Sequence, residues 1–350
     1  MTMTLTDMDL AKFNAHIESL VAEDQFSGAV LVAKHGEPVY KNAFGLANKG
    51  YGIPNRTDTK FNLGSVNKMF TAVAILRLAE DGLLHVHDLI GKYLPHFPPE
   101  PANKITIHHL LTHTSGTGLY WNDEYEASFT KLKTVEDYLP LFIEDPLLFE
   151  PGTQWFYSNS GYIILGAIIE SVSGKDYFTF VKENVYGPAN MPDTDCYDLE
   201  YDVPNLAAGY TREGTKEGEP RRNNWFLHAV KGGPAGGGYS TVEDLLRFDI
   251  ALRGNKLLSP EWTALAITDK FQSYGPDMQK HYGYGFMDIR KHGERIVGHN
   301  GGFPGVSALL NMYMLSGYTL VILSNYDAQG TIGIHRKFED LLFGNGQYEN

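Results

Sequence analysis

The chain has few of the residues on which several classes of protein depend. Its 350 residues include a single cysteine, Cys196, so neither an intrachain disulfide nor a cysteine-based metal cluster can form. Basic residues are also scarce: 29 lysines and arginines stand against 42 aspartates and glutamates, which gives a formal net charge of −13. Nucleic-acid phosphates and anionic membrane surfaces attract a basic face, and this composition therefore argues against both as partners.

Long apolar runs are missing as well. No segment reaches the ~20 consecutive apolar residues of a transmembrane helix. Residues 1–9 contain neither the positive segment nor the apolar core of a signal peptide, which predicts a cytoplasmic location. Hydrophobic residues nevertheless make up 43% of the chain, which is ample for the core of a globular protein.

Several motifs of enzyme chemistry are absent or incomplete. No Gly-x-Ser-x-Gly sequence occurs, which argues against the α/β-hydrolase fold. The glycine-rich stretch 232–238 lacks the flanking strand and helix of a nucleotide-binding fingerprint. His109 and His113 have the i, i+4 spacing of a zinc-binding helix, but the glutamate of that motif is missing. We therefore expect no cofactor and no metal.

The two ends of the chain carry the pattern of strands. Residues 7–23 predict an amphipathic helix, and strands at 27–34 and 38–44 flank His35-Gly36, which has the chemistry of a tight hairpin turn. At the carboxyl end, strands and a closing helix are predicted at 284–289, 295–297, 306–314, 318–324 and 332–343. These patterns indicate two terminal helices packed on one antiparallel sheet, to which both ends of the chain contribute.

The central region has a different character. Apolar periodicity predicts helices at 67–81, 106–113, 162–172, 176–184 and 241–252, and no strong strand signal interrupts them. We therefore predict an α/β (α+β) fold in which residues 1–60 and 283–350 form a domain around the antiparallel sheet. Residues 61–282 form an inserted, mainly helical domain, and we expect the active site at the junction of the two domains.

Ser65 and Lys68 are the first candidates for chemistry. Positions i and i+3 lie on one face of a helix about one turn apart, so the Lys68 amine can reach the Ser65 hydroxyl and take its proton. The unpaired N–H groups at a helix start also favour negative charge near the serine. The pattern alone is weak, because Ser128 and Lys131 share it in a polar segment, and Ser65 could simply be a residue at the start of a helix.

Two loops supply further candidates. The loop 151–162 carries Tyr157, which could shuttle protons, and Asn159, which could hydrogen-bond a substrate carbonyl. Alternatively, Tyr157 is a half-buried tyrosine and Asn159 is a helix cap. The loop 298–305 is rich in glycine, and the backbone N–H of Gly302 could complete an oxyanion hole, although a glycine-rich bulge with a surface histidine explains the same residues.

Together these segments resemble a known family. The order and the flanking residues of three motifs are similar to those of the serine β-lactamase-like superfamily: Ser65-x-x-Lys68, Tyr157-x-Asn159 and His299-x-Gly301. The resemblance is to its branch of class C β-lactamases, DD-peptidases and family VIII carboxylesterases. Segments that look like linking motifs of this family extend the resemblance over nearly the whole chain: 110–116, 149–153, 157–162, 237–245 and 298–305.

The resemblance implies a role for each residue of these motifs. Ser65 would be acylated, and Lys68 and Tyr157 would share the roles of base and acid. Asn159 would orient the acyl group, and the backbone N–H groups of Ser65 and Gly302 would form the oxyanion hole. The resemblance also makes the histidines of the incomplete zinc motif part of the scaffold.

The third motif departs from that of the strong β-lactamases. His299 takes the position of a lysine, which offers a substrate carboxylate a fixed positive charge, whereas a histidine near neutral pH is charged only in part. Asn300 replaces the usual hydroxyl residue. The resemblance assigns His299 and Gly301 to substrate binding, but the two departures weaken the case for efficient β-lactam hydrolysis.

We therefore predict a serine hydrolase that acts through an acyl-enzyme on small esters or amides, with carboxylesterase activity favoured. One alternative is a D-amino-acid peptidase or a DD-carboxypeptidase of the penicillin-binding protein type, with weak β-lactamase activity. A non-catalytic ligand-binding homologue is an alternative of another class. The expected partner is a small ester, amide or D-peptide substrate, and the sequence predicts no oligomeric state.

Overall fold

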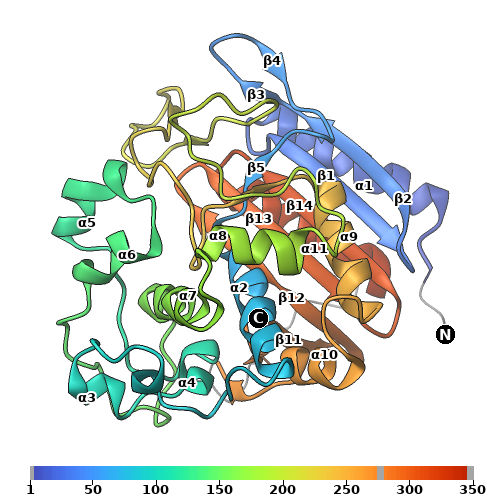
Figure 1. Ribbon diagram of the computed structural model, residues 1–350. Coiled ribbons are helices and arrows are strands. Elements are labelled where there is room, and N and C mark those ends of the chain that lie inside the picture. Colours follow the sequence, from blue (N-terminus) through green and yellow to red (C-terminus); the bar gives the residue numbers. More distant parts are fainter. Residues whose placement is uncertain (1–3, 274–279, 345–350) are drawn as a thin grey trace.

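One large antiparallel sheet organises the protein. The computed structural model describes residues 4–273 and 280–344. Within them, an eight-stranded sheet has the order β2-β1-β14-β13-β12-β11-β10-β9 (Figure 1). Its strands are β1 (Gly28–Lys34), β2 (Glu37–Phe44), β9 (Phe271–Gln272), β10 (Lys280–Tyr282), β11 (Met287–Lys291), β12 (Glu294–Phe303), β13 (Val306–Tyr313) and β14 (Tyr318–Ser324). The predicted fold class, with its antiparallel sheet, is confirmed.

The two ends of the chain meet inside this sheet. β1 pairs antiparallel with β14, beginning with Gly28 opposite Ser324. β1 turns into β2 through His35 and Gly36, whose φ angles of 50° and 84° both lie in the left-handed region. This is the backbone of a tight two-residue hairpin turn, so the turn predicted at His35-Gly36 is confirmed.

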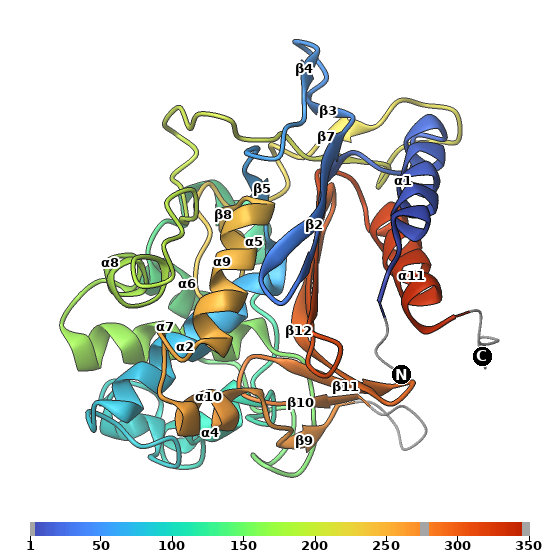
Figure 2. The ribbon, with the colours of Figure 1, turned by 90° about the vertical axis from the view of Figure 1, so that its right-hand side faces the viewer.

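One face of the sheet is covered by the two terminal helices. α1 (Asp7–Ala22) and α11 (Gln329–Phe343) lie side by side on it (Figure 2). Thr6 caps α1, because its side chain accepts a hydrogen bond from the backbone N–H of Asp9. The layer between helices and sheet is apolar and includes Phe13, Ile17, Val30, Leu320 and Phe338. Each such side chain stabilises the fold by roughly 1.5–3 kcal/mol when buried.

The opposite face carries the remaining helices (Figure 2). At their centre, α2 (Asn67–Glu80) and α7 (Asn159–Ser173) pack on each other and are buried over most of their length. α9 (Val242–Arg253) lies against β1 and β14. The shorter helices are α3 (Pro99–Ala102), α4 (Ile107–Leu111), α5 (Asp123–Ser128), α6 (Val135–Tyr138), α8 (Tyr177–Val181) and α10 (Pro260–Ile267). No helix in residues 4–273 and 280–344 is both long and apolar enough to cross a membrane.

The central region contains short strands, although no strong strand signal interrupts it in the sequence. β9 and β10 lie in it and extend the large sheet at one edge. Short strands pair elsewhere in the central region, namely β5 (Phe61–Asn62) with β8 (Tyr239–Ser240) and β6 (Tyr210–Thr211) with β7 (Arg222–Asn223). Strands of two or three residues are too short to produce a detectable alternation of apolar and polar residues. The division at residues 60 and 283 stays a prediction.

A glycine shifts the strand that was expected at 284–289. The strand, β11, begins only at Met287. Gly285 has a φ of 79°, and a β-carbon on it would lie 2.5 Å from the β-carbon of Ala72 in α2. The chain therefore bends at Gly285 to pack on α2 before it enters the sheet.

Two of the predicted helices differ from the structure near their carboxyl ends. The helix expected at 106–113 ends at Leu111, because His113 has a φ of 61° and so leaves the right-handed region. The helix expected at 176–184 is α8, which continues as a π-helical turn, Lys182–Tyr186.

Candidate active site

Ser65 stands at the entrance to α2. It lies in a 3-10 turn, Gly64–Val66, that runs directly into the helix. Gly64 has a φ of 48°, and a β-carbon on it would lie 2.9 Å from the backbone nitrogen of Gly302, so the position requires glycine. Ser65 lines a cavity, and the Nζ atom of Lys68 lies 3.2 Å from its Oγ atom. The two residues therefore meet as the i, i+3 spacing predicts.

Lys68 is completely enclosed. Its side chain has no exposed surface. Besides Ser65, its Nζ atom contacts Oδ1 of Asn159 at 2.7 Å and the backbone oxygen of Ala235 at 2.5 Å, and no carboxylate of the described residues pairs with it. Burial lowers the pKa of Lys68 well below its usual range. The surroundings thus favour the neutral amine.

Asn159 and Tyr157 approach Lys68 from the start of α7. Ser158 caps this helix by accepting a hydrogen bond from the backbone N–H of Gly161 at 2.9 Å. Asn159 is therefore the first residue of α7, neither the cap nor the tip of a loop, and it lines the cavity with its Oδ1 atom on Lys68. The ring centroid of Tyr157 lies 4.8 Å from the Nζ atom of Lys68.

Strand β12 closes the site from the side of the sheet. A β-carbon on Gly301 would lie 1.9 Å from the backbone oxygen of Leu63 and 2.9 Å from the backbone nitrogen of Ser65. Gly302 has free space at its α-carbon and lines the cavity. The backbone nitrogens of Ser65 and Gly302 thus both lie where β12 touches the start of α2, a placement compatible with a shared oxyanion site.

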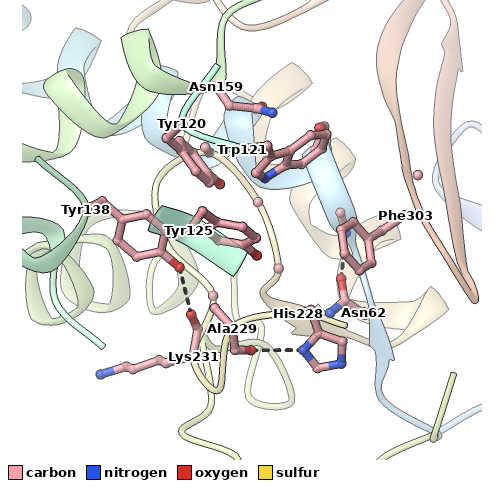
Figure 3. A pocket seen from close by; sticks show the side chains of 17 residues that line it. Asn62, Tyr120, Trp121, Tyr125, Tyr138, Asn159, His228, Ala229, Lys231 and Phe303 are labelled. Carbon is pink, nitrogen blue, oxygen red and sulfur yellow. Dashed lines mark hydrogen bonds between the residues drawn. The ribbon is translucent and has the colours of Figure 1, made fainter. Parts of the chain in front are cut away.

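The cavity beside Ser65, which we call the Ser65 cavity, has aromatic walls. Five rings surround it, those of Tyr120, Trp121, Tyr125, Tyr138 and Phe303 (Figure 3). Polar side chains in the lining include Asn62, Asn159 and His228. Burial lowers the pKa of His228, so its ring is neutral near pH 7.

Lys231 is the one charged residue in the lining that the structure describes. Its ammonium group lies 3.6 Å from the ring centroid of Phe178, which does not line the cavity. In Figure 3 the nitrogen points away from Phe303 and His228. The Ser65 cavity therefore presents no charged group to a ligand.

Comparison with known proteins identifies the family. A family model described as Beta-lactamase matches residues 13–342. Penicillin-binding protein 4* of Bacillus subtilis (strain 168) is 32% identical and matches over 93% of this chain and 74% of its own length. Esterase EstB of Burkholderia gladioli is also 32% identical, over 79% of each chain. A solved penicillin-binding protein from Bacillus halodurans superimposes with a TM-score of 0.84 at 30% identity, over 93% of this chain and 99% of that protein.

The chain belongs to the beta-lactamase family. It is a serine hydrolase, as the resemblance of its motifs predicts. The fold prediction is confirmed by the same superposition. Within the described residues of this beta-lactamase family member, no group of three or more histidine, cysteine or acidic residues is placed to hold a metal ion.

His299 of this family member is not the partly charged residue that the sequence predicts. The residue is 1% exposed, with Nε2 2.9 Å from the hydroxyl of Tyr282 and Nδ1 2.6 Å from the backbone oxygen of Asn300. Burial, followed by the nearby Lys68, lowers the pKa of His299 to about 3, so the ring is neutral at pH 7. Neither His299 nor Gly301 lines the Ser65 cavity, and their contact with substrate stays a prediction.

Sequence reasoning missed several residues that shape the site of this family member. Tyr125, Tyr138 and Phe303 come from three separate segments, and nothing in their local pattern indicates that they share a cavity. His113 was assigned to the scaffold, yet its ring centroid lies 4.4 Å from that of Tyr157. Its place in the family-like segment 110–116 was the signal that could have drawn attention to it.

Proposed function

We propose that the protein is a carboxylesterase that hydrolyses small, uncharged esters through an acyl-enzyme on Ser65. The observation that carries this proposal is the contact between Ser65 and a fully buried Lys68 at the edge of an uncharged, aromatic cavity. The contact supplies the nucleophile with a base. The cavity selects the substrate.

The hydrogen bonds of Lys68 suit it to the role of base. A neutral amine has two N–H donors and one lone pair. Oδ1 of Asn159 and the backbone oxygen of Ala235 are acceptors and take the two N–H groups. The lone pair is then left for the hydroxyl of Ser65, which is the arrangement that general-base catalysis needs.

Acylation would proceed from this arrangement. The Oγ atom of Ser65 forms a bond to the ester carbonyl carbon while its proton passes to Nζ of Lys68. The carbonyl oxygen becomes negatively charged and receives hydrogen bonds from the N–H groups of Ser65 and Gly302, each worth roughly 100- to 1000-fold in rate. The bond to the alcohol then breaks, and Tyr157, which lies beside Lys68, gives its phenol proton to the departing oxygen and takes the extra proton from Lys68, which becomes neutral again.

Deacylation would use the same groups in reverse. Water attacks the acyl carbonyl and gives one proton to Tyr157, as Tyr157 gives its phenol proton to Lys68. The tetrahedral intermediate collapses by breaking the bond to Oγ of Ser65, which regains a proton as the carboxylic acid leaves. Asn159, with Oδ1 held by Lys68, retains its amide N–H groups to orient the acyl carbonyl.

The charge of the site supports an uncharged substrate. A penicillin or a peptide ending in D-alanine carries a carboxylate, which a binding site recognises with a cation. His299 is neutral, and the ammonium of Lys231 lies over Phe178 outside the cavity. The aromatic walls suit an apolar acyl group.

A D-amino-acid peptidase or DD-carboxypeptidase with weak β-lactamase activity is the second candidate. The similarity to Penicillin-binding protein 4* and to the putative penicillin-binding protein PbpX supports it, whereas the similarity to Esterase EstB supports the first. The contact between Ser65 and Lys68 speaks against a non-catalytic homologue.

A panel of p-nitrophenyl butyrate, nitrocefin and a D-alanyl-D-alanine peptide tests the proposal. We expect the ester to be the best substrate, and Ser65→Ala to lose at least about a thousandfold of this activity. Ser128→Ala is the matched control, because Ser128 opens the second Ser-x-x-Lys pattern but donates its hydroxyl to the backbone oxygen of Glu124. It should retain full activity.

Three other outcomes would contradict the proposal or favour another function. Unchanged turnover by Ser65→Ala contradicts the nucleophile assignment. Faster turnover of nitrocefin or of the peptide favours the second candidate. No turnover, with no labelling of Ser65 by a fluorophosphonate probe, favours the binding homologue.

A further inference from the structure

His113 is enclosed by the segment that carries Tyr157. It follows α4 in the left-handed backbone region and has no exposed surface. Its backbone oxygen accepts a hydrogen bond from the N–H of Phe156 at 3.0 Å. Its Nδ1 atom accepts another from the N–H of Ser158, also at 3.0 Å. His113 therefore holds the residues on both sides of Tyr157.

The imidazole ring also packs directly on the Tyr157 ring. The two centroids are 4.4 Å apart, with an angle of 36° between the planes. Around the rest of its surface the imidazole contacts the rings of Tyr282, Tyr162 and Trp155, at centroid distances of 4.8, 5.1 and 5.9 Å. A ring packed on this many sides keeps one orientation and limits the movement of its neighbours.

The hydrogen bond to Ser158 fixes the protonation state of His113. Because Nδ1 accepts, the ring proton lies on Nε2, which is buried without a hydrogen-bond partner among the described residues. Burial, with Lys68 and His299 as further causes, lowers the pKa of His113 well below its usual range.

We propose that His113 is a positioning residue that fixes the phenol of Tyr157 beside Lys68. The inference rests on the proposed function, in which Tyr157 delivers a proton to the leaving alcohol. Substitution of His113 should therefore slow most the esters whose leaving alcohol needs this proton. An alkyl alkoxide leaves poorly unless it is protonated, whereas p-nitrophenolate leaves without a proton.

Two substitutions separate the contacts of His113. His113→Asn suits the left-handed backbone and places an oxygen where Nδ1 accepts the N–H of Ser158, but it removes the ring. His113→Phe keeps a ring and removes the acceptor. His109→Asn is the matched control, because Nδ1 of His109 also accepts a backbone N–H, that of Thr106 at 3.2 Å, at a site beside Gly152.

The readout is the ratio of kcat/KM for ethyl butyrate to kcat/KM for p-nitrophenyl butyrate. Both values report acylation by the same acyl group, so the ratio isolates the need for a proton. We expect His113→Asn to lower the ratio at least about tenfold, because misplacing a catalytic group by about 1 Å can cost a hundredfold in rate. His113→Phe should lower it less, and His109→Asn should leave it unchanged. An unchanged ratio in both His113 variants, with wild-type melting temperatures, would overturn the proposal.

A double-mutant cycle with Tyr157→Phe separates this inference from the proposed function. If His113 acts through Tyr157, Tyr157→Phe lowers the ratio and the addition of His113→Asn lowers it no further. Independent, multiplicative losses would overturn the positioning role and leave the proposed function intact. A wild-type ratio in Tyr157→Phe would overturn the positioning role together with the role of Tyr157 as proton donor, whereas ester hydrolysis through Ser65 is decided by the substrate panel and Ser65→Ala. His113→Phe supplies the same cycle if His113→Asn does not fold.

Discussion

Lys60 and Lys68 are both buried, and their surroundings differ in one decisive respect. Lys60 is 7% exposed, and its Nζ atom lies 2.9 Å from the carboxylate of Asp193 and 3.2 Å from the backbone oxygen of Pro204. The hydrogen-bond partners of Lys68 among the described residues are uncharged oxygens, those of Ser65, Asn159 and Ala235. A carboxylate keeps a buried lysine charged, and its omission favours the neutral amine. In the proposed mechanism, Lys68 can therefore act as the base because no carboxylate of the described residues pairs with it.

Exchange of each lysine for arginine gives the largest expected contrast. A guanidinium stays protonated, so Lys68→Arg cannot act as a base and should lose at least about a hundredfold in kcat/KM for p-nitrophenyl butyrate. Lys60→Arg keeps its pairing with Asp193, whose side chain is 44% exposed, and should stay within about twofold of the wild type. Steady-state kinetics of the two variants measure the contrast. Near-normal turnover by Lys68→Arg would contradict this contrast between the two lysines.

The pH dependence of stability sharpens the same contrast. The pKa of Lys68 is lowered in the folded protein and about 10.4 in the unfolded chain, so between these values the unfolded chain holds one more proton. The free energy of unfolding should therefore rise with pH through that window, by up to about 1.4 kcal/mol per pH unit, and this contribution is lost as pH falls. Urea unfolding at several pH values measures this rise, which Lys68→Met should not show. Lys60→Met should still show this rise. If the free energy of unfolding rose equally with pH in Lys68→Met and in the wild type, a neutral Lys68 would be contradicted.

His299 offers a smaller test, because it is buried close to Lys68 but should not control the pH profile. Its pKa of about 3 keeps it neutral from about pH 5 upward. The rate should fall as pH drops through the pKa of Lys68, since only the neutral amine accepts a proton. His299→Gln should lower kcat/KM by less than about tenfold and leave unchanged the pH at which the rate has fallen to half. A shift of this pH in the variant would mean that His299, and not Lys68, causes the fall of the rate at low pH.

Lys231 should give the smallest effect. Its ammonium lies over Phe178, so Lys231→Met should change the ratio of ester to nitrocefin turnover by less than about threefold. Parallel assays of the two substrates measure this ratio. A large gain in ester preference would mean that Lys231 reaches into the Ser65 cavity and supplies the missing cation.

The sequence predicts the parts of the structure that depend on long local patterns. The sequence places β1, β14 and α2 almost to the residue, because β1 and β14 are apolar runs of seven residues bounded by turns and α2 is an apolar helix of 14 residues. β9 and β10 are not placed in this way, since they contain two and three residues, which are too few to show a pattern of apolar and polar residues. The contact between Ser65 and Lys68 follows from spacing along one helix, and it too could be predicted.

The electrostatics of the site could not be predicted in this way. The charge of His299 depends on burial and on Lys68, which lies more than 200 positions earlier in the chain, and the sequence therefore suggested the wrong state. The enclosure of His113 by residues 155–158 depends on how two loops meet. Both are properties of packing between distant segments, which no local pattern records.

The central claim is that Lys68 is a neutral amine poised to deprotonate Ser65. The most direct measurement is the ¹³Cε chemical shift of Lys68 as a function of pH, in protein labelled at lysine and assigned by comparison with Lys68→Arg. The account predicts that this signal titrates at a pH well below the usual range of lysine, and that kcat/KM for p-nitrophenyl butyrate falls with the same midpoint. A signal that stays that of the ammonium form up to about pH 10, while the enzyme remains active at pH 7, would contradict it.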